Sequence, residues 1–355
     1  MQSIMKYFHS SIIFTVVVCA LVFFFLGGTA ALFTTLLLGV LEVSLSFDNA
    51  VVNATVIKDM DDKWRHRFIT WGMAIAVFGM RMVFPLAIVA IIANIGPIDA
   101  LNMALFKPED YAKTLTSAHL EVAAFGGAFL AMVFWKFFVD EEKDNHWIGF
   151  IEKPMAAIGK IEAVQVALTI ASMYAVTKFL PAEEHLSFWL SGLAGIVTYI
   201  IADGFGALME STEEGMTSNG AAMAKSGFAM FMYLEILDAS FSFDGVIGSF
   251  ALTNNIFIIA AGLGIGAMFV RSLTLMLVDK GTLDEFAYLE HSAFWAIGVL
   301  AATMFIGTFI EIPEAITGLS SAAIIAAGVI HSIYVKKQEE SADISSEGQA
   351  TSGPL

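Results

Sequence analysis

Long runs of apolar residues, separated by short polar segments, extend over most of the chain. The run at 11–28 contains no charged residue, and a helix of about 20 apolar residues crosses the ~30 Å hydrocarbon core of a bilayer. A signal peptide is the alternative for this run, but no A-x-A-like cleavage site follows it, so we expect a retained helix. The pattern predicts about ten transmembrane helices, at 10–28, 31–53, 68–95, 119–139, 162–180, 186–206, 228–250, 255–278, 291–310 and 315–335.

The composition favours an all-α polytopic membrane protein in a lipid bilayer and excludes several other classes. Hydrophobic residues make up 57% of the 355 positions and charged residues 15%, against about 45–50% and about 25% in soluble domains. A net charge of −16 offers no basic surface to nucleic acid. Cys19 is the single cysteine, so the sequence contains neither an internal disulfide nor a Cys/His zinc pattern.

The distribution of Lys and Arg predicts the orientation, because loops rich in these residues stay in the cytoplasm. Thirteen of the 18 basic residues fall in segments on the same side of the membrane as the N-terminus, and three (Lys107, Lys113 and Lys178) fall on the other side. Arg81 and Arg271 lie within spans. We therefore expect both termini in the cytoplasm and a disordered polar tail at 336–355.

A short acidic motif occurs once in the second span and once in the seventh. Residues 42–49 read Glu-Val-Ser-Leu-Ser-Phe-Asp-Asn, and residues 238–245 read Asp-Ala-Ser-Phe-Ser-Phe-Asp-Gly. The shared pattern, acid-x-Ser-x-Ser-Phe-Asp, recurs nowhere else in the chain. Because acidic residues within membrane spans are rare, we interpret this match as an internal duplication.

The similarity continues through the next two spans. Gly72 and Arg81 are nine residues apart in the third span, as are Gly262 and Arg271 in the eighth, and a Leu-Glu pair opens the fourth and the ninth. The copies begin five spans apart, an odd number, so they have opposite orientations; this is an inverted-topology repeat of three helices, as in many secondary transporters. The expected organisation is an additional helix at 1–29, repeat units at 30–140 and 225–310, a two-span insert at 141–224, a final helix at 311–335 and the tail at 336–355.

Five carboxylates lie well inside apolar spans, namely Glu42, Asp48, Glu235, Asp238 and Asp244. A charge at the bilayer centre costs at least about 2.5–3.5 kcal/mol, so these groups must face one another, a cavity, a cation or the two buried arginines. The acids outnumber Arg81 and Arg271, which leaves negative charge for a cation or for protons. A purely structural acid–arginine network is the alternative.

The groups around these acids are oxygen donors, which suit Mn²⁺, Mg²⁺ or Ca²⁺. We expect one site centred on Asp48 and Asp244. The predicted metal ligands are Asp48, Asp244, Glu42, Asp238, Glu235 and Asn49, and the predicted supporting residues are Ser46, Ser242, Arg81, Arg271, Glu121 and Glu290. Glu121 and Glu290 stand at the starts of spans, where the helix dipole alone also favours an acid.

The spacing of Glu42 and Asp48 constrains the second span. Six residues separate them, so their side chains lie about 120° apart around a continuous helix. Either one acid binds the ion at a time, or the helix is locally unwound and its free carbonyls become ligands, or each acid serves a different cavity. Asn49 and Gly245, directly after the two aspartates, are compatible with a break.

The motifs resemble the TerC/Alx family of bacterial membrane proteins, which is related to a wider superfamily that includes lysine exporters. The matching segments are Leu41-Glu42-x-x-Leu45-Ser46-x-Asp48-Asn49, Glu235-x-x-Asp238-x-x-Phe241-x-x-Asp244, Arg271-Ser272-Leu273 and Ile312-Pro313-Glu314-x-x-Thr317-Gly318-Leu319. The resemblance covers roughly residues 30–140 and 225–335. Gly245-Val246-Ile247 departs from the usual Ser followed by Ile-Pro-Ala, so the chain looks like a divergent branch. The resemblance implies export of Mn²⁺ across the bacterial inner membrane, with an older label of tellurium resistance.

Three functional hypotheses follow. The first is a secondary transporter of a divalent cation, most simply Mn²⁺, coupled to protons through the same carboxylates; no Walker A pattern indicates direct use of ATP. The second is a non-transporting scaffold of a tellurium or stress-resistance system. The third is an intramembrane acid-dependent enzyme, but H-E-x-x-H and G-x-S-x-G motifs are absent from the sequence. We therefore expect a transporter with no cofactor rather than an enzyme.

Overall fold

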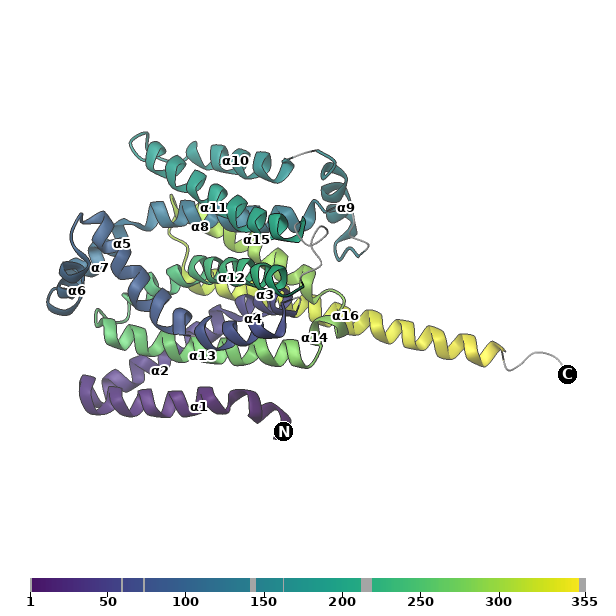
Figure 1. The fold of residues 1–355 in the computed structure, drawn as a ribbon, viewed down its shortest axis with the longest axis horizontal. Helices are drawn as coiled ribbons and strands as arrows, with labels where there is room; N and C mark the ends of the chain where they lie inside the picture. Colours follow the sequence, from purple (N-terminus) through teal and green to yellow (C-terminus); the bar gives the residue numbers. More distant parts are fainter. Residues whose placement is uncertain are drawn as a thin grey trace.

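The structure is a computed structural model that describes residues 2–58, 60–72, 74–140, 145–161, 163–211 and 219–350. Some side chains within its helices also lie outside the description, and that of Asp244 is among them. All regular elements of the described part are helical. Most of them run along one common direction, so that they form a bundle from which α16 extends at one end (Figure 1).

The N-terminal half contains one helix that is broken and others that are widened to π-helix. Its elements are α1 (Gln2–Val22), η1 (Phe23–Gly27), α2 (Gly28–Leu45), α3 (Phe47–Lys58), α4 (Asp62–Arg67), η2 (Phe68–Gly72), η3 (Ile75–Val83), α5 (Phe84–Ile92), α6 (Pro97–Phe106), α7 (Pro108–Ser117), α8 (His119–Phe138) and α9 (Gly149–Ile158). The C-terminal half contains α10 (Val164–Thr177), α11 (His185–Ser211), α12 (Asn219–Ser249), α13 (Ile256–Asp279), α14 (Thr282–Glu285), α15 (Leu289–Gly307) and α16 (Glu314–Ala350).

Seven described helices or helical stretches are long and apolar enough to cross a membrane, which supports the polytopic class predicted from the sequence. They are Met5–Leu45, Ile75–Ile92, His119–Phe138, His185–Asp203, Ile256–Asp279, Leu289–Gly307 and Ile316–Gln338. The remaining expected spans are also helical but differ in character. The first two form the single stretch Met5–Leu45, the fifth is a shorter apolar helix, Val164–Thr177, and the seventh is α12, which carries the second acidic motif.

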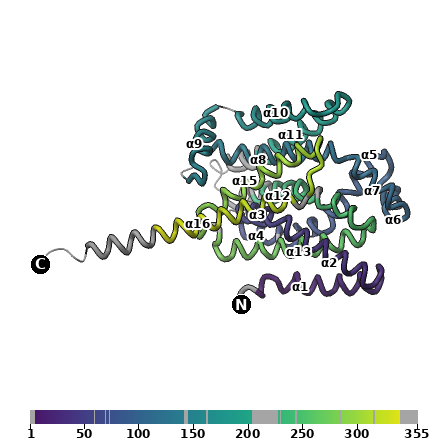
Figure 2. The backbone as a smooth tube through the Cα atoms, turned by 180° about the vertical axis from the view of Figure 1, so that it is seen from behind, coloured from purple at the N-terminus to yellow at the C-terminus, as the bar shows by residue number. Residues whose placement is uncertain are grey.

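The chain reverses direction between α1 and α2. Gly27 and Gly28 have φ angles of 136° and 66°, a backbone region that residues with a side chain rarely adopt. Both views of the backbone show α1 and α2 meeting at this reversal and α1 lying along α13 (Figure 2). The stretch Met5–Leu45 is thus two helices, and the glycine pair explains why no polar loop marks the boundary in the sequence.

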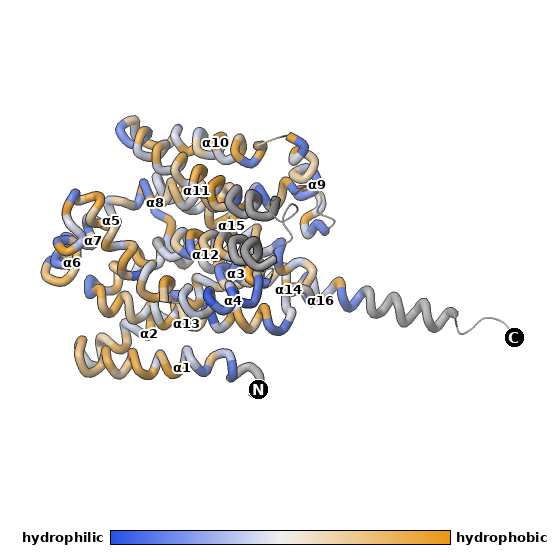
Figure 3. The backbone as a smooth tube through the Cα atoms, viewed as in Figure 1, coloured by the Kyte–Doolittle hydropathy of each residue, from blue (hydrophilic) through white to orange (hydrophobic). Residues whose placement is uncertain are grey.

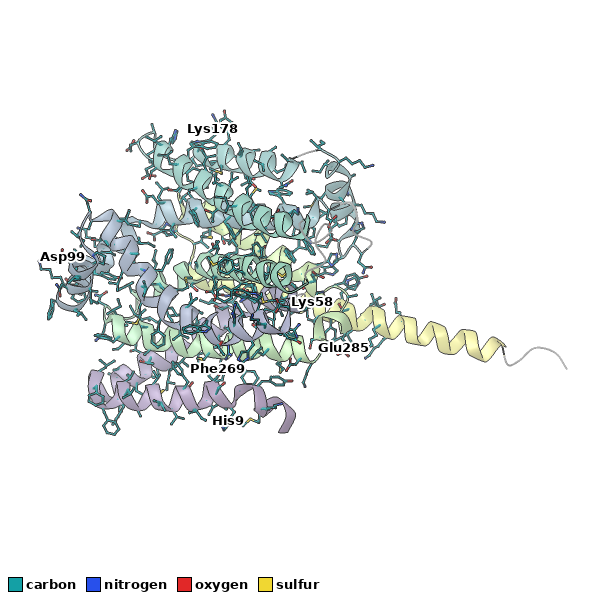
Figure 4. The ribbon with its side chains drawn as sticks, viewed as in Figure 1. His9, Lys58, Asp99, Lys178, Phe269 and Glu285 are labelled. Atoms are coloured by element: carbon teal, nitrogen blue, oxygen red, sulfur yellow. The ribbon has the colours of Figure 1, made fainter. Side chains whose placement is uncertain are left out.

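The bundle is covered by apolar side chains, as expected for a protein surrounded by lipid. Phe25, Phe106 and Ile91 are among many large hydrophobic residues on its surface. Hydrophobic positions extend along the helices, whereas hydrophilic ones gather at helix ends, for example at α4 and α9 (Figure 3). Lys58 and Glu285 lie toward one end of the bundle and Asp99 at the other (Figure 4).

The C-terminal segment differs from the sequence-based expectation of disorder. α16 continues as a single helix to Ala350, well into the polar segment that begins at 336. A helix already formed in the apolar part propagates at little cost per residue. Within the expected insert at 141–224, residues 141–144, 162 and 212–218 lie outside the described residues.

Candidate functional site

The second span is interrupted between its two acids. Ser46 has φ −103° and ψ 22° and separates α2 from α3. Ser46 is nevertheless hydrogen-bonded to the helices on both sides. Its N–H donates to the Glu42 carbonyl of α2 at 2.9 Å, and its carbonyl accepts the Ala50 N–H of α3 at 3.2 Å. Asp48 lies in the first turn of α3, and its Oδ1 accepts the Asn49 N–H at 2.9 Å. The helix is therefore interrupted at Ser46, as one of the alternatives expected, but the Glu42 and Ser46 carbonyls are hydrogen-bonded rather than free to bind an ion.

Glu42 is paired with a buried arginine. Its Oε1 lies 2.5 Å from Arg81 Nη2, and the two side chains are 4% and 3% exposed. Ser46 Oγ also donates to Glu42 Oε1, at 3.3 Å. Arg81 belongs to the π-helical segment η3, and its Nη1 donates to the Ala76 carbonyl one turn earlier. The expected acid–arginine pairing thus occurs for Arg81.

A cavity of about 550 Å³ reaches from these acids to one end of the bundle. Glu42, Ser46 and Asp48 form its inner wall. At its other end it is bounded by the last turn of α7, the start of α8 and the loop between α15 and α16, all at the end opposite the N-terminus. Threonine and serine hydroxyls and one carboxylate contribute further polar groups to its wall: Thr116, Thr303, Thr308, Thr317, Ser321 and Glu311.

Asp238 lies on the other side of α3, in a separate polar cluster. Its Oδ1 accepts hydrogen bonds from the amide Nδ2 atoms of Asn49 at 2.6 Å and Asn53 at 3.3 Å. All three side chains are buried. Together with Arg81 and Arg271 they line a small cavity of about 30 Å³. The two cavities therefore reach the motifs from opposite sides, with the Glu42–Arg81 pair between them.

The two acidic motifs pack directly on each other. Gly245 lies beside Glu42, because a Cβ added at Gly245 would be 3.0 Å from Glu42 Oε2. At the other end of the motifs, Asn49 contacts Asp238. Position 42 is therefore next to 245, and position 49 is next to 238. A break of the second motif at Gly245, which the sequence allowed, does not occur, because α12 is a continuous helix through this residue. Gly245 instead lets the Glu42 side chain approach α12 closely.

The other predicted site residues are less central. Glu235 is buried, and neither carboxylate oxygen has a hydrogen-bond partner within the described part of the chain; it lies beside Gly72, where an added Cβ would be 2.8 Å from its Oε1. Ser242 is also buried. No described carboxylate lies within ion-pairing distance of Arg271. The side chain of Asp244, half of the predicted centre, lies outside the described residues.

Glu121 and Glu290 lie away from both cavities. Each stands in the first turn of its helix, α8 or α15. Glu121 Oε1 accepts a hydrogen bond from Ser187 Oγ at 2.6 Å, and Glu290 lies 4.0 Å from Lys58 Nζ. These local contacts and the helix dipole account for both acids.

Sequence reasoning overlooked two residues that the structure places beside the motifs, Asn53 at the small cavity and Ser321 at the large one. Asn53 is one helical turn after Asn49 and shares its face of α3, so the i, i+4 spacing of two asparagines was an available signal. Ser321 joins the cavity from α16, and no local pattern connects it with the motifs. Among the residues that the structure describes, no three His, Cys, Asp or Glu side chains gather closely enough to hold a metal ion.

A bundle of apolar helices around a buried polar centre defines an integral membrane protein of the polytopic α-helical class. The chain belongs to the family described as "Protein of unknown function (DUF475)", whose model matches residues 47–339. It is also similar to "Uncharacterized membrane protein YceF" of Bacillus subtilis (strain 168), with 28% identity over 138 residues, which cover 37% of this chain and 51% of that protein. The chain thus matches about half the length of this curated relative. No solved structure matches it.

Proposed function

We propose that the protein is a secondary transporter of a divalent cation, most simply Mn²⁺. The observation that carries this proposal is the cavity of about 550 Å³ that ends at the buried carboxylates of Glu42 and Asp48. Carboxylate and hydroxyl oxygens are ligands that Mn²⁺ and Mg²⁺ accept. The resemblance of the motifs to the TerC/Alx family favours Mn²⁺. We further propose that the protein moves the cation out of the cytoplasm across a bacterial inner membrane, with its own N-terminus on the cytoplasmic side.

Contacts between the motifs support an inverted repeat as the basis of transport. In the proposed repeat, position 42 corresponds to 238 and position 49 to 245. A two-fold axis that exchanges the copies converts the contact of 42 with 245 into a contact of 238 with 49, and the structure contains both. Such reciprocity is characteristic of two-fold related surfaces.

A second pair of contacts has the same reciprocity. Gly72 lies beside Glu235, and a Cβ added at Gly39 would lie 3.3 Å from the Gly262 carbonyl oxygen. Position 72 corresponds to 262, and Glu235 corresponds to Gly39 by the motif offset. Both pairs therefore support the same axis, which passes between α2–α3 and α12. Substrate sites of inverted-repeat transporters lie at this kind of interface.

Flux measurements on purified protein test the proposal. Vesicles reconstituted with the full chain should take up Mn²⁺ under an imposed gradient, as reported by an entrapped indicator. Asp48→Asn keeps the shape and removes the charge, so uptake should fall at least about tenfold, since even partners of metal ligands contribute roughly 10–100-fold to affinity. Asp244→Asn should behave alike. Asp99→Asn is the matched control, because Asp99 is exposed at one end of the bundle.

The result that would overturn the proposal is equally specific. If Asp48→Asn and Asp244→Asn both elute as folded protein and transport Mn²⁺ at the rate of Asp99→Asn, the acids are structural. If wild-type vesicles show no uptake of Mn²⁺, Mg²⁺ or Ca²⁺, the scaffold hypothesis takes its place.

A further inference from the structure

The small cavity beside Asp238 contains a carboxylate that lacks a counter-ion. Asp238 is 8% exposed, yet no described Lys, Arg or His nitrogen lies within 4.0 Å of it. Its hydrogen-bond partners are the neutral amides of Asn49 and Asn53. Glu42, by contrast, has Arg81 at 2.5 Å. An ionised carboxylate removed from water and left without an opposite charge is costly, so the cluster around Asp238 is suited to receive a cation.

The two asparagines provide the remaining ligands. Asn49 and Asn53 are 3% and 4% exposed, and their Oδ1 atoms have no hydrogen-bond partner in the described part of the chain. Both residues line the small cavity together with Asp238. Rotation of each amide about its Cβ–Cγ bond exchanges nitrogen for oxygen without backbone movement. The same three residues then present amide oxygens and a carboxylate to an ion.

The charge around the cavity selects a monovalent ion. Glu42 and Arg81 neutralise each other. Among the other described side chains, Asp238 and Arg271 line the cavity, and Glu235 lies beside Gly72, which also lines it. The charges of Asp238, Glu235 and Arg271 sum to one formal negative charge. A divalent ion would leave an excess positive charge in a low-dielectric interior, whereas a monovalent ion leaves none.

The size of the cavity restricts the ion further. Its volume of about 30 Å³ is close to that of one water molecule, so the ion must enter without its hydration shell. Three protein oxygens replace part of that shell, as side-chain and carbonyl oxygens do at coupling-ion sites between transporter repeats. A compact ion fits this space better than potassium does.

From these observations we propose that Asp238, Asn49 and Asn53 form a sodium site, distinct from the cavity of Glu42 and Asp48, which binds the coupling ion of the transporter. This inference rests on the proposed function, and it replaces the proton coupling expected from the sequence. The asparagine amides have two alternative orientations in this proposal. Their N–H groups donate hydrogen bonds to Asp238 when sodium is absent, and their oxygens coordinate sodium when it is bound. Since Asn49 follows Asp48 directly, occupation of this site affects the carboxylate on the other side of α3.

Direct binding of ²²Na⁺ to the purified full chain in detergent tests the site without requiring flux. Wild-type protein should bind ²²Na⁺ saturably, and unlabelled Na⁺ should displace it at concentrations where K⁺ does not. Asn53→Ala should weaken binding by roughly tenfold or more. Asn102→Ala is the matched control, because Asn102 is exposed on α6. Asn53→Asp keeps the shape and adds a negative charge, so Ca²⁺ or Mn²⁺ should displace ²²Na⁺ from this variant at concentrations that leave the wild type loaded.

Flux of Mn²⁺ through reconstituted vesicles separates this inference from the proposed function. A sodium gradient should accelerate Mn²⁺ movement in the wild type, and Asn53→Ala should abolish that acceleration while retaining flux under a Mn²⁺ gradient alone. Mn²⁺ flux without ²²Na⁺ binding would overturn the sodium site and leave the transporter proposal intact. Binding of ²²Na⁺ without flux of any divalent cation would support the site and refute the proposed cargo. Equal displacement by K⁺, or a proton gradient that replaces the sodium gradient, would refute the assignment to sodium.

Discussion

Removal of one partner of the Glu42–Arg81 pair should be far more costly than removal of both. The side chains are 4% and 3% exposed and their charged atoms are 2.5 Å apart. Glu42→Gln leaves the Arg81 guanidinium buried without its counter-charge, and Arg81→Gln does the same to Glu42. Breaking a buried pair in this way costs about 3–5 kcal/mol, whereas replacing both charges is often close to neutral. The double variant should therefore recover most of the stability lost in either single variant.

Reversible unfolding in SDS, followed by tryptophan fluorescence, provides the free energies for this double-mutant cycle. The matched control is the Lys136–Asp203 pair, whose atoms are 3.7 Å apart and whose side chains are 55% and 44% exposed. Exposed pairs contribute about 0.2–1 kcal/mol, so Asp203→Asn should have little effect. If Glu42→Gln lowers the free energy of unfolding by no more than Asp203→Asn does, Arg81 is not what neutralises Glu42. The separation of the two cavities would then not depend on the Glu42–Arg81 ion pair.

The same variants connect stability with the proposed cargo. In Arg81→Gln the Glu42 carboxylate borders the large cavity without a protein counter-charge, so a bound divalent cation should take the place of the guanidinium. A ligand at 100 times its Kd stabilises a folded protein by about 2.7 kcal/mol. We expect Mn²⁺ to stabilise Arg81→Gln by more than it stabilises the wild type. Equal stabilisation of both proteins would mean that Mn²⁺ does not reach Glu42.

Three further predictions concern the surroundings of the site. Gly266→Ala should displace Glu42 and lower Mn²⁺ uptake, because the new Cβ would lie 2.3 Å from Glu42 Cγ. Gly149→Ala is the control, since its Cβ would meet only Lys153 Cε at 3.7 Å. Equal Mn²⁺ uptake by the two variants would contradict the prediction. Cysteines at positions 63 and 107 should react with an impermeant reagent from opposite sides of the membrane; labelling from one side would refute the topology. Glu152→Gln should expose α9 to proteolysis, since this buried carboxylate accepts three N–H groups and hydrogen bonds to a charged group each contribute about 1.5–3 kcal/mol.

Periodicity and charge in the sequence were sufficient for the class of fold and for the position of the buried acids. The apolar runs predicted the helices, and the six-residue spacing of Glu42 and Asp48 made a broken helix one of three alternatives; the structure has an interruption at Ser46. These properties are local, so a single segment of sequence contains the physical reason for each. The pairing of Arg81 with an acid also followed, because a buried guanidinium needs one.

The residues that contact each buried acid could not be predicted from the sequence around that acid. The amides that hold Asp238 come from residues 185 and 189 positions away, and no spacing rule connects them. Gly245 illustrates a different limit. A glycine after an acidic motif is compatible with a helix break and equally with the close approach of another chain segment. The Glu42 side chain, which lies directly beside Gly245, shows that the second use applies here. Composition alone does not distinguish these two uses of glycine.

Residues 42–49 and 238–245 differ in conformation, and under the proposed repeat this difference indicates how transport would proceed. Residues 42–49 are interrupted at Ser46 and residues 238–245 form a continuous helix, although both segments contribute to the wall of the large cavity. Glu42 holds Arg81, but the corresponding Asp238 does not hold Arg271 and is bound by amides instead. Under the proposed two-fold relation, exchange of these roles produces a state in which α12 is broken, Asp238 pairs with Arg271 and the large cavity reaches the opposite face. Alternating access requires such a pair of states, and a cysteine at position 274, beside the small cavity, should become reactive to an impermeant reagent when the role exchange occurs.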